Sequence, residues 1–210
     1  MNFELFAPEQ NDNILPCDGI VKDYGLILDA DQAQQYFDYF LKHLAWQHDE
    51  VLLYGKYYQT ARKVVWYGDD FYHYHYSGMA KQSHLWHPLL LSLKQQIEHI
   101  TGHQFNSCLA NLYEDGTQAV GWHSDDEPAL IGPQGETVIA SVSLGATRKF
   151  RFKHKTGAEQ VDLMLHSGQL IVMRGKTQRY WKHALTKSMK VTEPRINLTF
   201  RYFYPEASSK

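Results

Sequence analysis

The chain has 210 residues, enough for one domain with a sizeable hydrophobic core. Hydrophobic residues make up 43% and charged residues 21%, a balance that excludes a disordered chain. The net charge of -2 gives no overall support for nucleic-acid binding, so such binding would depend on local patches. Two isolated cysteines, no membrane-length apolar run and no signal-peptide pattern predict a soluble, cytoplasmic protein that contacts no membrane.

The first half of the chain predicts two helices and several strands. Residues 1–25 show no sustained period, so we expect an irregular arm. Apolar residues at helical spacing predict a helix from about Asp31 to Leu44. Residues 51–58 predict a hairpin with Gly55 at its turn, and two further strands are expected at 62–67 and 71–76. Residues 88–101 predict a second helix, with proline at its start and glycine after its end.

The second half reads as a succession of short strands separated by turn residues. We predict these strands at residues 106–113, 118–122, 138–144, 149–154, 161–165, 169–173, 180–184 and 195–204. Eight such strands are typical of a jelly roll. The sequence therefore predicts a mainly β fold with flanking helices. We expect a single domain over residues 1–210, with a jelly-roll core at about 105–204 and an N-terminal part at about 1–104.

A histidine and an aspartate two positions apart form the first candidate site. In an extended chain His123 and Asp125 project to the same side. A distant third ligand would complete a facial triad that leaves open positions, which suits non-haem Fe(II) binding a chelating cosubstrate and oxygen. His154, His166 and His183 are all candidates for that ligand. The alternative is that the acidic run after His123 is only a solvated turn.

The last predicted strand divides its polar and apolar residues between two faces. Arg195, Asn197, Thr199 and Arg201 alternate with apolar residues and therefore share one face. Arginine binds carboxylates through its planar fork, so this face could hold an acidic ligand. Asn111 and Tyr113 likewise share a face of their strand and could add hydrogen bonds. The alternative is that the polar face is simply solvated.

Three segments together resemble a known family. They read NLYEDGTQAVGWHSDDEPAL, VIASVSLGATRKFRFKHK and RINLTFRYF, and the likeness covers roughly residues 52–203. In order and spacing they are similar to the AlkB family of Fe(II)- and 2-oxoglutarate-dependent dioxygenases. The resemblance implies a double-stranded β-helix of jelly-roll type with an N-terminal nucleotide-recognition lid. It also implies Fe(II), 2-oxoglutarate and O2 as the reactive partners, and oxidative demethylation of N-alkylated nucleobases as the reaction.

The resemblance also implies roles for individual residues. The iron ligands would be His123, Asp125 and His183, which selects one of the three open histidines. The residues holding 2-oxoglutarate would be Asn111, Tyr113, Arg195, Asn197 and Arg201. The residues contacting the target base would be Glu127, Tyr74, Tyr76 and Ser77, the last three within the stretch YHYHYSG.

Other candidate nucleic-acid contacts come from a basic strand and a hairpin tip. Lys149, Arg151, Lys153 and Lys155 share one strand face, a basic rail that could track phosphates, with Arg62 and Lys63 as an extension. The alternative is an edge strand protected by charge. Tyr54 lies at the tip of the predicted hairpin, and its position resembles the finger with which duplex-acting relatives open the base stack. It could instead pack on the first helix.

Together these features predict a monomeric nucleic-acid enzyme. We expect direct-reversal repair of 1-methyladenine and 3-methylcytosine in DNA. The alternatives are an oxygenase of the same family acting on RNA, protein or lipid, and a non-catalytic jelly-roll binding protein that retains a metal. The short turn after Lys155 stands where some duplex-specific relatives have a long basic loop, so it argues against a strong preference for duplexes.

Overall fold

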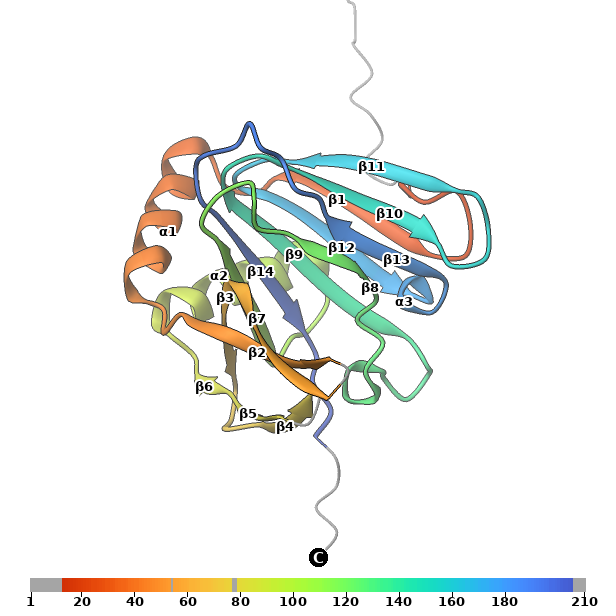
Figure 1. The fold of residues 1–210 in the computed structure, drawn as a ribbon, viewed down its shortest axis with the longest axis horizontal. Coiled ribbons are helices and arrows are strands. Elements are labelled where there is room, and N and C mark those ends of the chain that lie inside the picture. The colour runs from red at the N-terminus through yellow and green to blue at the C-terminus, as the bar shows by residue number, and fades with distance from the viewer. Residues whose placement is uncertain (1–12, 54, 77–78, 206–210) are drawn as a thin grey trace, which may run out of the picture.

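The computed structural model describes residues 13–53, 55–76 and 79–205, which form mainly antiparallel strands (Figure 1). The larger sheet has the order β1-β12-β9-β14-β7-β3-β2, with β6 attached beside β3. Its strands are β1 Ile20–Leu26, β2 Gln47–Leu53, β3 Lys56–Gly68, β6 His84–Leu85, β7 Ser107–Tyr113, β9 Thr137–Gly145, β12 Gln169–Gly175 and β14 Arg195–Arg201.

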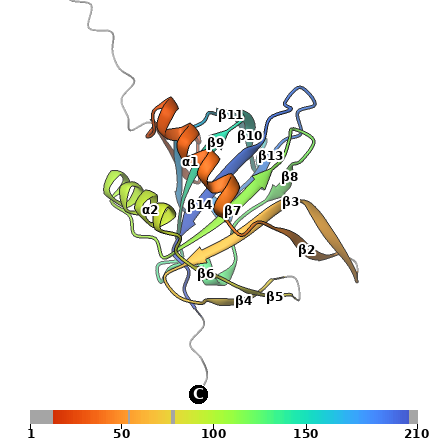
Figure 2. The same ribbon diagram turned by 90° about the vertical axis from the view of Figure 1, so that its left-hand side faces the viewer.

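A smaller sheet faces the larger one, and the two enclose the site (Figures 1 and 2). Its order is β11-β10-β13-β8, from β8 Val120–His123, β10 Arg148–His154, β11 Gln160–Leu165 and β13 Trp181–Leu185. Two short helical turns, η1 Pro128–Leu130 and α3 Thr177–Tyr180, follow β8 and precede β13. This arrangement confirms the predicted jelly-roll fold with flanking helices.

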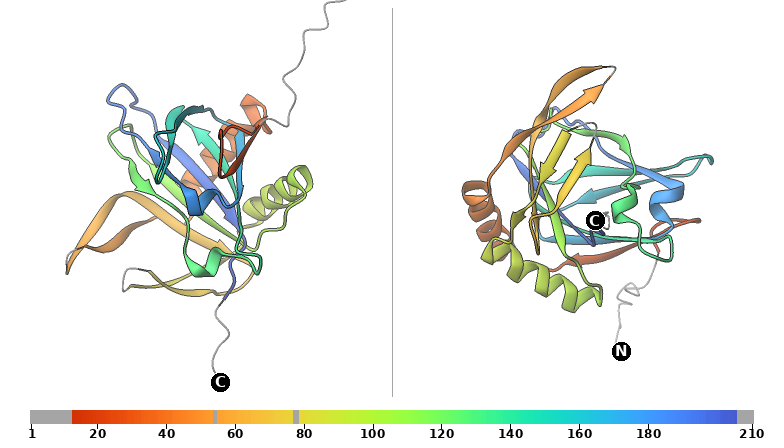
Figure 3. Two further views of the ribbon diagram at one scale, coloured as in Figure 1. Left: turned by 90° about the vertical axis from the view of Figure 1, so that its right-hand side faces the viewer. Right: turned by 90° about the horizontal axis from the view of Figure 1, so that it is seen from below.

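Two hairpins project from the sandwich in the N-terminal part of the chain, where a lid was predicted (Figure 3). The first joins β2 to β3, and Gly55 at its turn has φ +74°, a left-handed conformation that glycine adopts without strain. The second joins β4 His73–Tyr76 to β5 Met79–Gln82. We refer to these two hairpins as the lid hairpins.

Two helices cover the outer face of the larger sheet. Helix α1 Ala30–His43 begins at a capping box made by Asp29 and Gln32. Helix α2 Pro88–Thr101 has proline in its first turn and ends at Gly102 in the left-handed conformation. Both helices were predicted, and both are confirmed. Within the described residues, no helix is long and apolar enough to cross a membrane.

Strand β14 has an apolar face that packs against the helices and a polar face that lines the site. Its residues Ile196, Leu198 and Phe200 are fully buried in one core cluster with side chains of α1 and α2. Because side chains alternate along a strand, the polar residues between them face the other way, into the space between the sheets. The predicted division of this strand is therefore confirmed, and its polar face is enclosed rather than solvated.

The structure corrects three predicted elements. Residues 20–25 were expected in an irregular arm but belong to β1, which pairs with β12 at the edge of the larger sheet. Its backbone pairing holds it there, and Val21 is its one buried residue, so no alternating pattern marked it. The hairpin strand and the strand expected at 62–67 are one continuous strand, β3. Strand β14 ends at Arg201, three residues earlier than predicted.

Gly145 ends β9 where two neighbours leave no room for a side chain. Its φ is +80°, and an added Cβ would lie 2.5 Å from the carbonyl oxygen of Pro194 and 2.7 Å from the ring of Phe37. Gly135 has a similar φ of +73° but no neighbour within 4 Å. We expect Gly135→Ala to lower the free energy of unfolding by about 1–3 kcal/mol through backbone strain alone. Gly145→Ala should cost clearly more, because Pro194 and Phe37 must also move.

Chemical denaturation of both variants checks this expectation. Equal losses in the two proteins would show that the contacts around Gly145 adapt without cost.

Candidate active site

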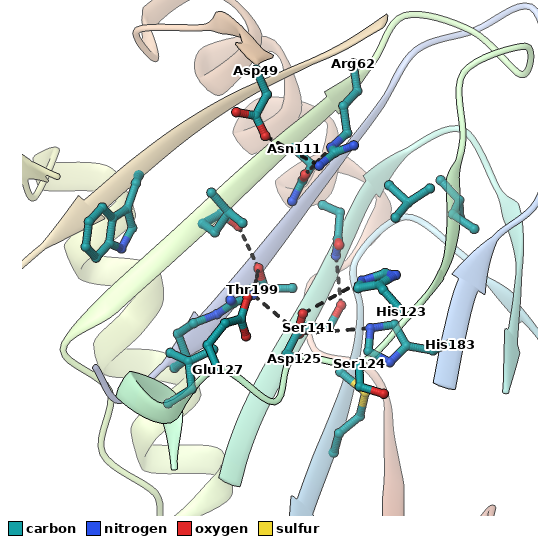
Figure 4. Close-up of a pocket in the computed structure, with 18 of the residues that line it drawn as sticks. Asp49, Arg62, Asn111, His123, Ser124, Asp125, Glu127, Ser141, His183 and Thr199 are labelled. Atoms are coloured by element: carbon teal, nitrogen blue, oxygen red, sulfur yellow. Dashed lines mark hydrogen bonds and ion pairs between the residues drawn. The ribbon is translucent and has the colours of Figure 1, made fainter. Parts of the chain in front are cut away.

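Strand pairing places two histidines that are distant in the sequence opposite each other. His123 on β8 lies directly opposite His183 on β13, and their ring centroids are 4.2 Å apart. Asp125 follows just beyond β8, with carboxylate oxygens 3.7 Å from Nε2 of His123 and 3.9 Å from Nε2 of His183 (Figure 4). The potential ligand atoms of the three residues all lie within 4.8 Å of one another. One metal ion could therefore contact all three.

The hydrogen bonding and burial of the two histidines suit metal binding. Nδ1 of His123 lies 2.8 Å from the carbonyl oxygen of Gly121. A carbonyl can only accept, so in the neutral ring Nδ1 carries the proton and Nε2 is left with a lone pair. Burial is the main cause that lowers the pKa of His183 to about 3. His183 is thus neutral at physiological pH, as a metal-binding imidazole must be.

A second group of potential ligands differs in this respect. Atoms of Cys17, Asp18 and His154 also lie within 4.8 Å of one another. However, the backbone N–H of Gly157 donates to Nδ1 of His154 at 2.8 Å, so the proton of the neutral ring is on Nε2. That Nε2 lies 3.3 Å from a carboxylate oxygen of Asp18. In this arrangement His154 offers the group a proton rather than a lone pair. Of the two groups found among the described residues, that of His123, Asp125 and His183 is the one whose histidines can offer lone pairs to a metal.

Asp125 is held in its charged form. It is buried, and its backbone N–H donates to Oε1 of Gln178 at 2.9 Å. Burial by itself would raise the pKa of this carboxyl. Arg201 is the largest of the opposing charges, with its guanidinium 3.6 Å from the carboxylate, and the pKa of Asp125 is lowered. A carboxylate beside two imidazoles is the donor set of non-haem Fe(II) oxygenases.

The predicted cosubstrate residues also face one another across strands. In the pairing of β14 with β7, Arg195 lies opposite Tyr113 and Asn197 opposite Asn111. All four residues and Arg201 line a cavity of about 620 Å³ that also contains the metal group. The structure thus brings together every residue that was predicted to hold 2-oxoglutarate.

Two arginines mark opposite ends of this polar face. Arg195 is fully buried, donates to Oγ of Ser143 at 2.8 Å, and lies 5.7 Å from the centre of the Tyr113 ring. Burial lowers its pKa to about 10, so it stays charged at neutral pH. Arg201, at the other end of β14, lies beside Asp125. Each keeps a buried Nε without a hydrogen-bond partner. Buried, unsatisfied cations at two ends of a cavity fit a dicarboxylate ligand.

The wall toward the lid contains a second acidic group. Glu127 lines the same cavity, and its Oε2 is buried with no hydrogen-bond partner. Burial raises the pKa of this carboxyl, although the charge of Arg201 opposes the shift. Tyr74 and Tyr76 belong to β4, but their side chains are outside the described part of the structure. Tyr54 and Ser77 lie outside the described residues altogether, so their predicted roles stay predictions.

The predicted basic rail is largely paired with acidic neighbours. Nε of Arg151 lies 2.6 Å and Nζ of Lys149 lies 3.4 Å from Asp162 on the adjacent β11. Lys155 pairs with Asp126 at 3.1 Å. Arg62, expected to extend this surface, instead lines the cavity. Any attraction of phosphates by the rail is therefore weakened by its own sheet.

Four residues in or around the site were not predicted from the sequence. Ser141 and Ser143 of β9 bind Asn197 and Arg195 through their hydroxyls, and polar residues within an otherwise apolar strand were the available signal. Arg148 is fully buried and donates to backbone carbonyls at 116, 118 and 186, which fixes the loop that follows Tyr113. Asp49 also lines the cavity. Nothing in the sequence distinguished Arg148 or Asp49 from surface charges.

The sequence has clear relatives. Residues 24–201 match the 2OG-Fe(II) oxygenase superfamily. The chain is 41% identical over 189 residues to the Bos taurus protein named alpha-ketoglutarate-dependent dioxygenase alkB homolog 3, which covers 85% of this chain and 64% of that protein. It is 34% identical over 206 residues to the Mus musculus protein named DNA oxidative demethylase ALKBH2, covering 91% of this chain and 83% of that protein.

A solved structure agrees on the fold. The structure of OsALKBH1 superposes with a TM-score of 0.59 at 17% identity, covering 89% of this chain and 99% of that chain. At this identity the likeness shows the fold alone. The chain spans just under two thirds of two alkB homolog 3 relatives, 64% of the bovine and 66% of the Homo sapiens protein.

The metal assignment predicts a selective loss of iron. We expect His123→Ala or Asp125→Ala to abolish stoichiometric Fe(II) binding and turnover of 2-oxoglutarate without unfolding the protein. Cys17→Ser is the matched control, because it alters the second ligand group and leaves the first intact. Metal analysis of anaerobically loaded protein, with circular dichroism, provides the measurement. Loss of iron in Cys17→Ser but not in His123→Ala would move the metal to the other group.

The cosubstrate assignment predicts a requirement for arginine. Lysine keeps the charge of Arg195 or Arg201 but cannot reproduce the planar fork. We expect each Arg→Lys change to weaken 2-oxoglutarate binding by about 10- to 100-fold, as for the loss of a charge-assisted hydrogen bond. Arg174→Lys, at an exposed position outside the cavity, is the control. Calorimetric titration that shows unchanged affinity in both cavity variants would remove β14 from the cosubstrate site.

Proposed function

Because the chain belongs to the 2OG-Fe(II) oxygenase superfamily, and within it to the AlkB family, we propose that it oxidatively removes alkyl groups from the bases of nucleic acids. Fe(II) and 2-oxoglutarate are the family's reactive partners, together with O2. The single observation that supports a base as the substrate is the position of Glu127. Its buried, unpartnered carboxyl oxygen lines the same cavity as the metal group, where a substrate would meet it.

The residues of the cavity divide into three tasks. His123, Asp125 and His183 hold the iron, which, once bound with 2-oxoglutarate and O2, supplies the oxidant for an unreactive C–H bond. Arg195 and Arg201 each bind one carboxylate of 2-oxoglutarate, and Asn111, Tyr113 and Asn197 line the face between them. Glu127 and the lid hairpins contact the substrate.

Cationic methylated bases suit the acidic wall. N1-methylation of adenine and N3-methylation of cytosine leave a positive charge on the ring. A carboxylate in a partly dry cavity attracts such a ring more strongly than it would in water. The target atoms lie on the pairing edge of the base, so the base must leave the stack to reach the iron. A cavity of about 620 Å³ is within the usual range for a small-molecule site.

We propose DNA as the substrate and direct reversal of base damage as the role. The relatives named DNA oxidative demethylase support this choice. The paired state of the basic rail and the short turn between β10 and β11 favour single strands over duplexes. We further propose that the protein is a cytoplasmic monomer and consists of one domain.

Release of succinate with different substrates tests the proposal. We expect a single-stranded DNA oligonucleotide containing 3-methylcytosine to stimulate succinate release and to lose its methyl group as formaldehyde. The same sequence without the methyl group should do neither. An RNA oligonucleotide, a histone peptide and a lipid dispersion cover the alternative substrates. Stimulation by one of these but not by methylated DNA would contradict the proposed function.

Glu127 supplies a sharper test of the base contact. Glu127→Gln keeps the shape of the side chain and removes its charge. We expect demethylation of 3-methylcytosine to slow by about 10-fold or more, the effect of losing a hydrogen bond to a charged group. Turnover of 2-oxoglutarate without oligonucleotide should change little. Equal slowing of both reactions would place Glu127 in the general architecture of the site rather than against the base.

A further inference from the structure

Asp49 is a buried carboxylate for which the proposed chemistry has no use. It lies on β2 with 7% of its surface exposed and lines the cavity on the lid side. The pairing of β2 with β3 is irregular at this position, since His48 lies opposite Lys63 but Glu50 lies opposite Gln59. The alternation of side chains is nevertheless kept, because Gln47 lies opposite Val64, and Asp49 and Arg62 each lie two residues away along their strands. Asp49 and Arg62 therefore share one face, and both line the cavity.

The carboxylate of Asp49 joins the two lid hairpins. One oxygen accepts a hydrogen bond from Nζ of Lys81 on β5, and the other lies 3.7 Å from Nη2 of Arg62 on β3. A buried carboxylate is costly unless cations and hydrogen bonds compensate it. Lys81 and Arg62 together compensate the buried charge of Asp49. The second hairpin is held to the first at this point.

Arg62 extends the connection into the cosubstrate pocket. Its Nε donates to Oδ1 of Asn111 at 3.1 Å. A guanidinium can only donate, so the atom that it contacts must be the amide oxygen of Asn111. The NH2 group of Asn111 is then available as a donor. Asn111 lies opposite Asn197 in the face that receives the cosubstrate. Arg62 thus fixes the orientation in which Asn111 can bind a carboxylate.

We propose that Asp49 is a positioning residue that couples the lid hairpins to the cosubstrate pocket through Arg62 and Asn111. Binding of 2-oxoglutarate favours one orientation of Asn111, and with it the ordered arrangement of Arg62, Asp49 and Lys81. The lid hairpins are then held in place for a base more firmly when the cosubstrate is bound. Because coupling between two ligands is reciprocal, the oligonucleotide strengthens 2-oxoglutarate binding by the same factor. This second half rests on the proposed function.

Asp49→Asn tests the coupling with minimal change of shape. The Mn(II)-loaded protein is titrated with 2-oxoglutarate without oxygen, first alone and then with saturating single-stranded DNA that contains 3-methylcytosine. In the wild type we expect the DNA to lower the Kd for 2-oxoglutarate. In Asp49→Asn we expect the Kd measured without DNA to rise by about 2- to 30-fold, the range for changes along a coupling network. The effect of DNA on that Kd should largely disappear.

Two further variants separate positioning from stability. Glu114→Gln is the matched control, because Glu114 also pairs with a lysine of β3, Lys63 at 2.7 Å, but is exposed and does not line the cavity. Glu114→Gln should change neither the Kd for 2-oxoglutarate nor the effect of DNA on that Kd. Lys81→Gln loosens the second hairpin and leaves the Arg62–Asn111 bond in place. It should leave the Kd without DNA unchanged and reduce only the effect of DNA. Melting temperatures show whether Asp49→Asn folds. If it does not, Lys81→Gln is the variant that tests the coupling.

The outcomes separate this inference from the proposed function. Wild-type protein that binds no methylated oligonucleotide would overturn the proposed function. A raised Kd for 2-oxoglutarate in Asp49→Asn, but not in Glu114→Gln, would even then support the positioning of Asn111. A folded Asp49→Asn protein with the wild-type Kd and the wild-type effect of DNA would overturn the inference. So would equal effects of Asp49→Asn and Glu114→Gln.

Discussion

The antiparallel pairing of β8 with β13 is the constraint on which the whole site depends. It places His123 opposite His183 across a single pair of strands, although the two residues are far apart in the sequence. Antiparallel neighbours on one face of a sheet lie close enough for their side chains to meet. A slip of one residue would turn one imidazole to the other face and destroy the site. The register of the smaller sheet therefore determines the geometry of the metal centre.

The larger sheet supplies the other half of the site by keeping its two faces distinct. The outer face of β14 packs into the core shared with α1 and α2, and its inner face presents buried cations to the cavity. A buried guanidinium is unfavourable without an anionic partner, and Arg201 has one in Asp125 at 3.6 Å. Along β14, packing against the helices is therefore on one face and the polar residues of the site are on the other. A second hydrophobic cluster, which includes Phe152, Ile171 and Trp181, packs between the two sheets.

Periodicity was sufficient to predict which residues share a face. It grouped Arg195 with Asn197 and Arg201, and Asn111 with Tyr113, and the structure shows that both sets face one cavity. It could not predict which strands pair, so His154, His166 and His183 stayed equivalent until the family resemblance selected one. The edge strand β1 was missed because backbone hydrogen bonds rather than an apolar face hold it in place. Arg62 was expected to extend a basic surface because the partners of its strand could not be predicted, and pairing of β3 with β2 and β7 turns it into the cavity instead.

The central claim is that one metal ion binds between His123, Asp125 and His183, with the dicarboxylate along β14. Anomalous X-ray diffraction from crystals grown with Mn(II) and 2-oxoglutarate without oxygen tests it most directly. The account predicts one strong anomalous peak within coordination distance of Nε2 of both histidines and of a carboxylate oxygen of Asp125. Density for 2-oxoglutarate should extend from this peak along the polar face of β14. A peak between Cys17, Asp18 and His154 instead, or coordination through Nδ1 of His123, would contradict it.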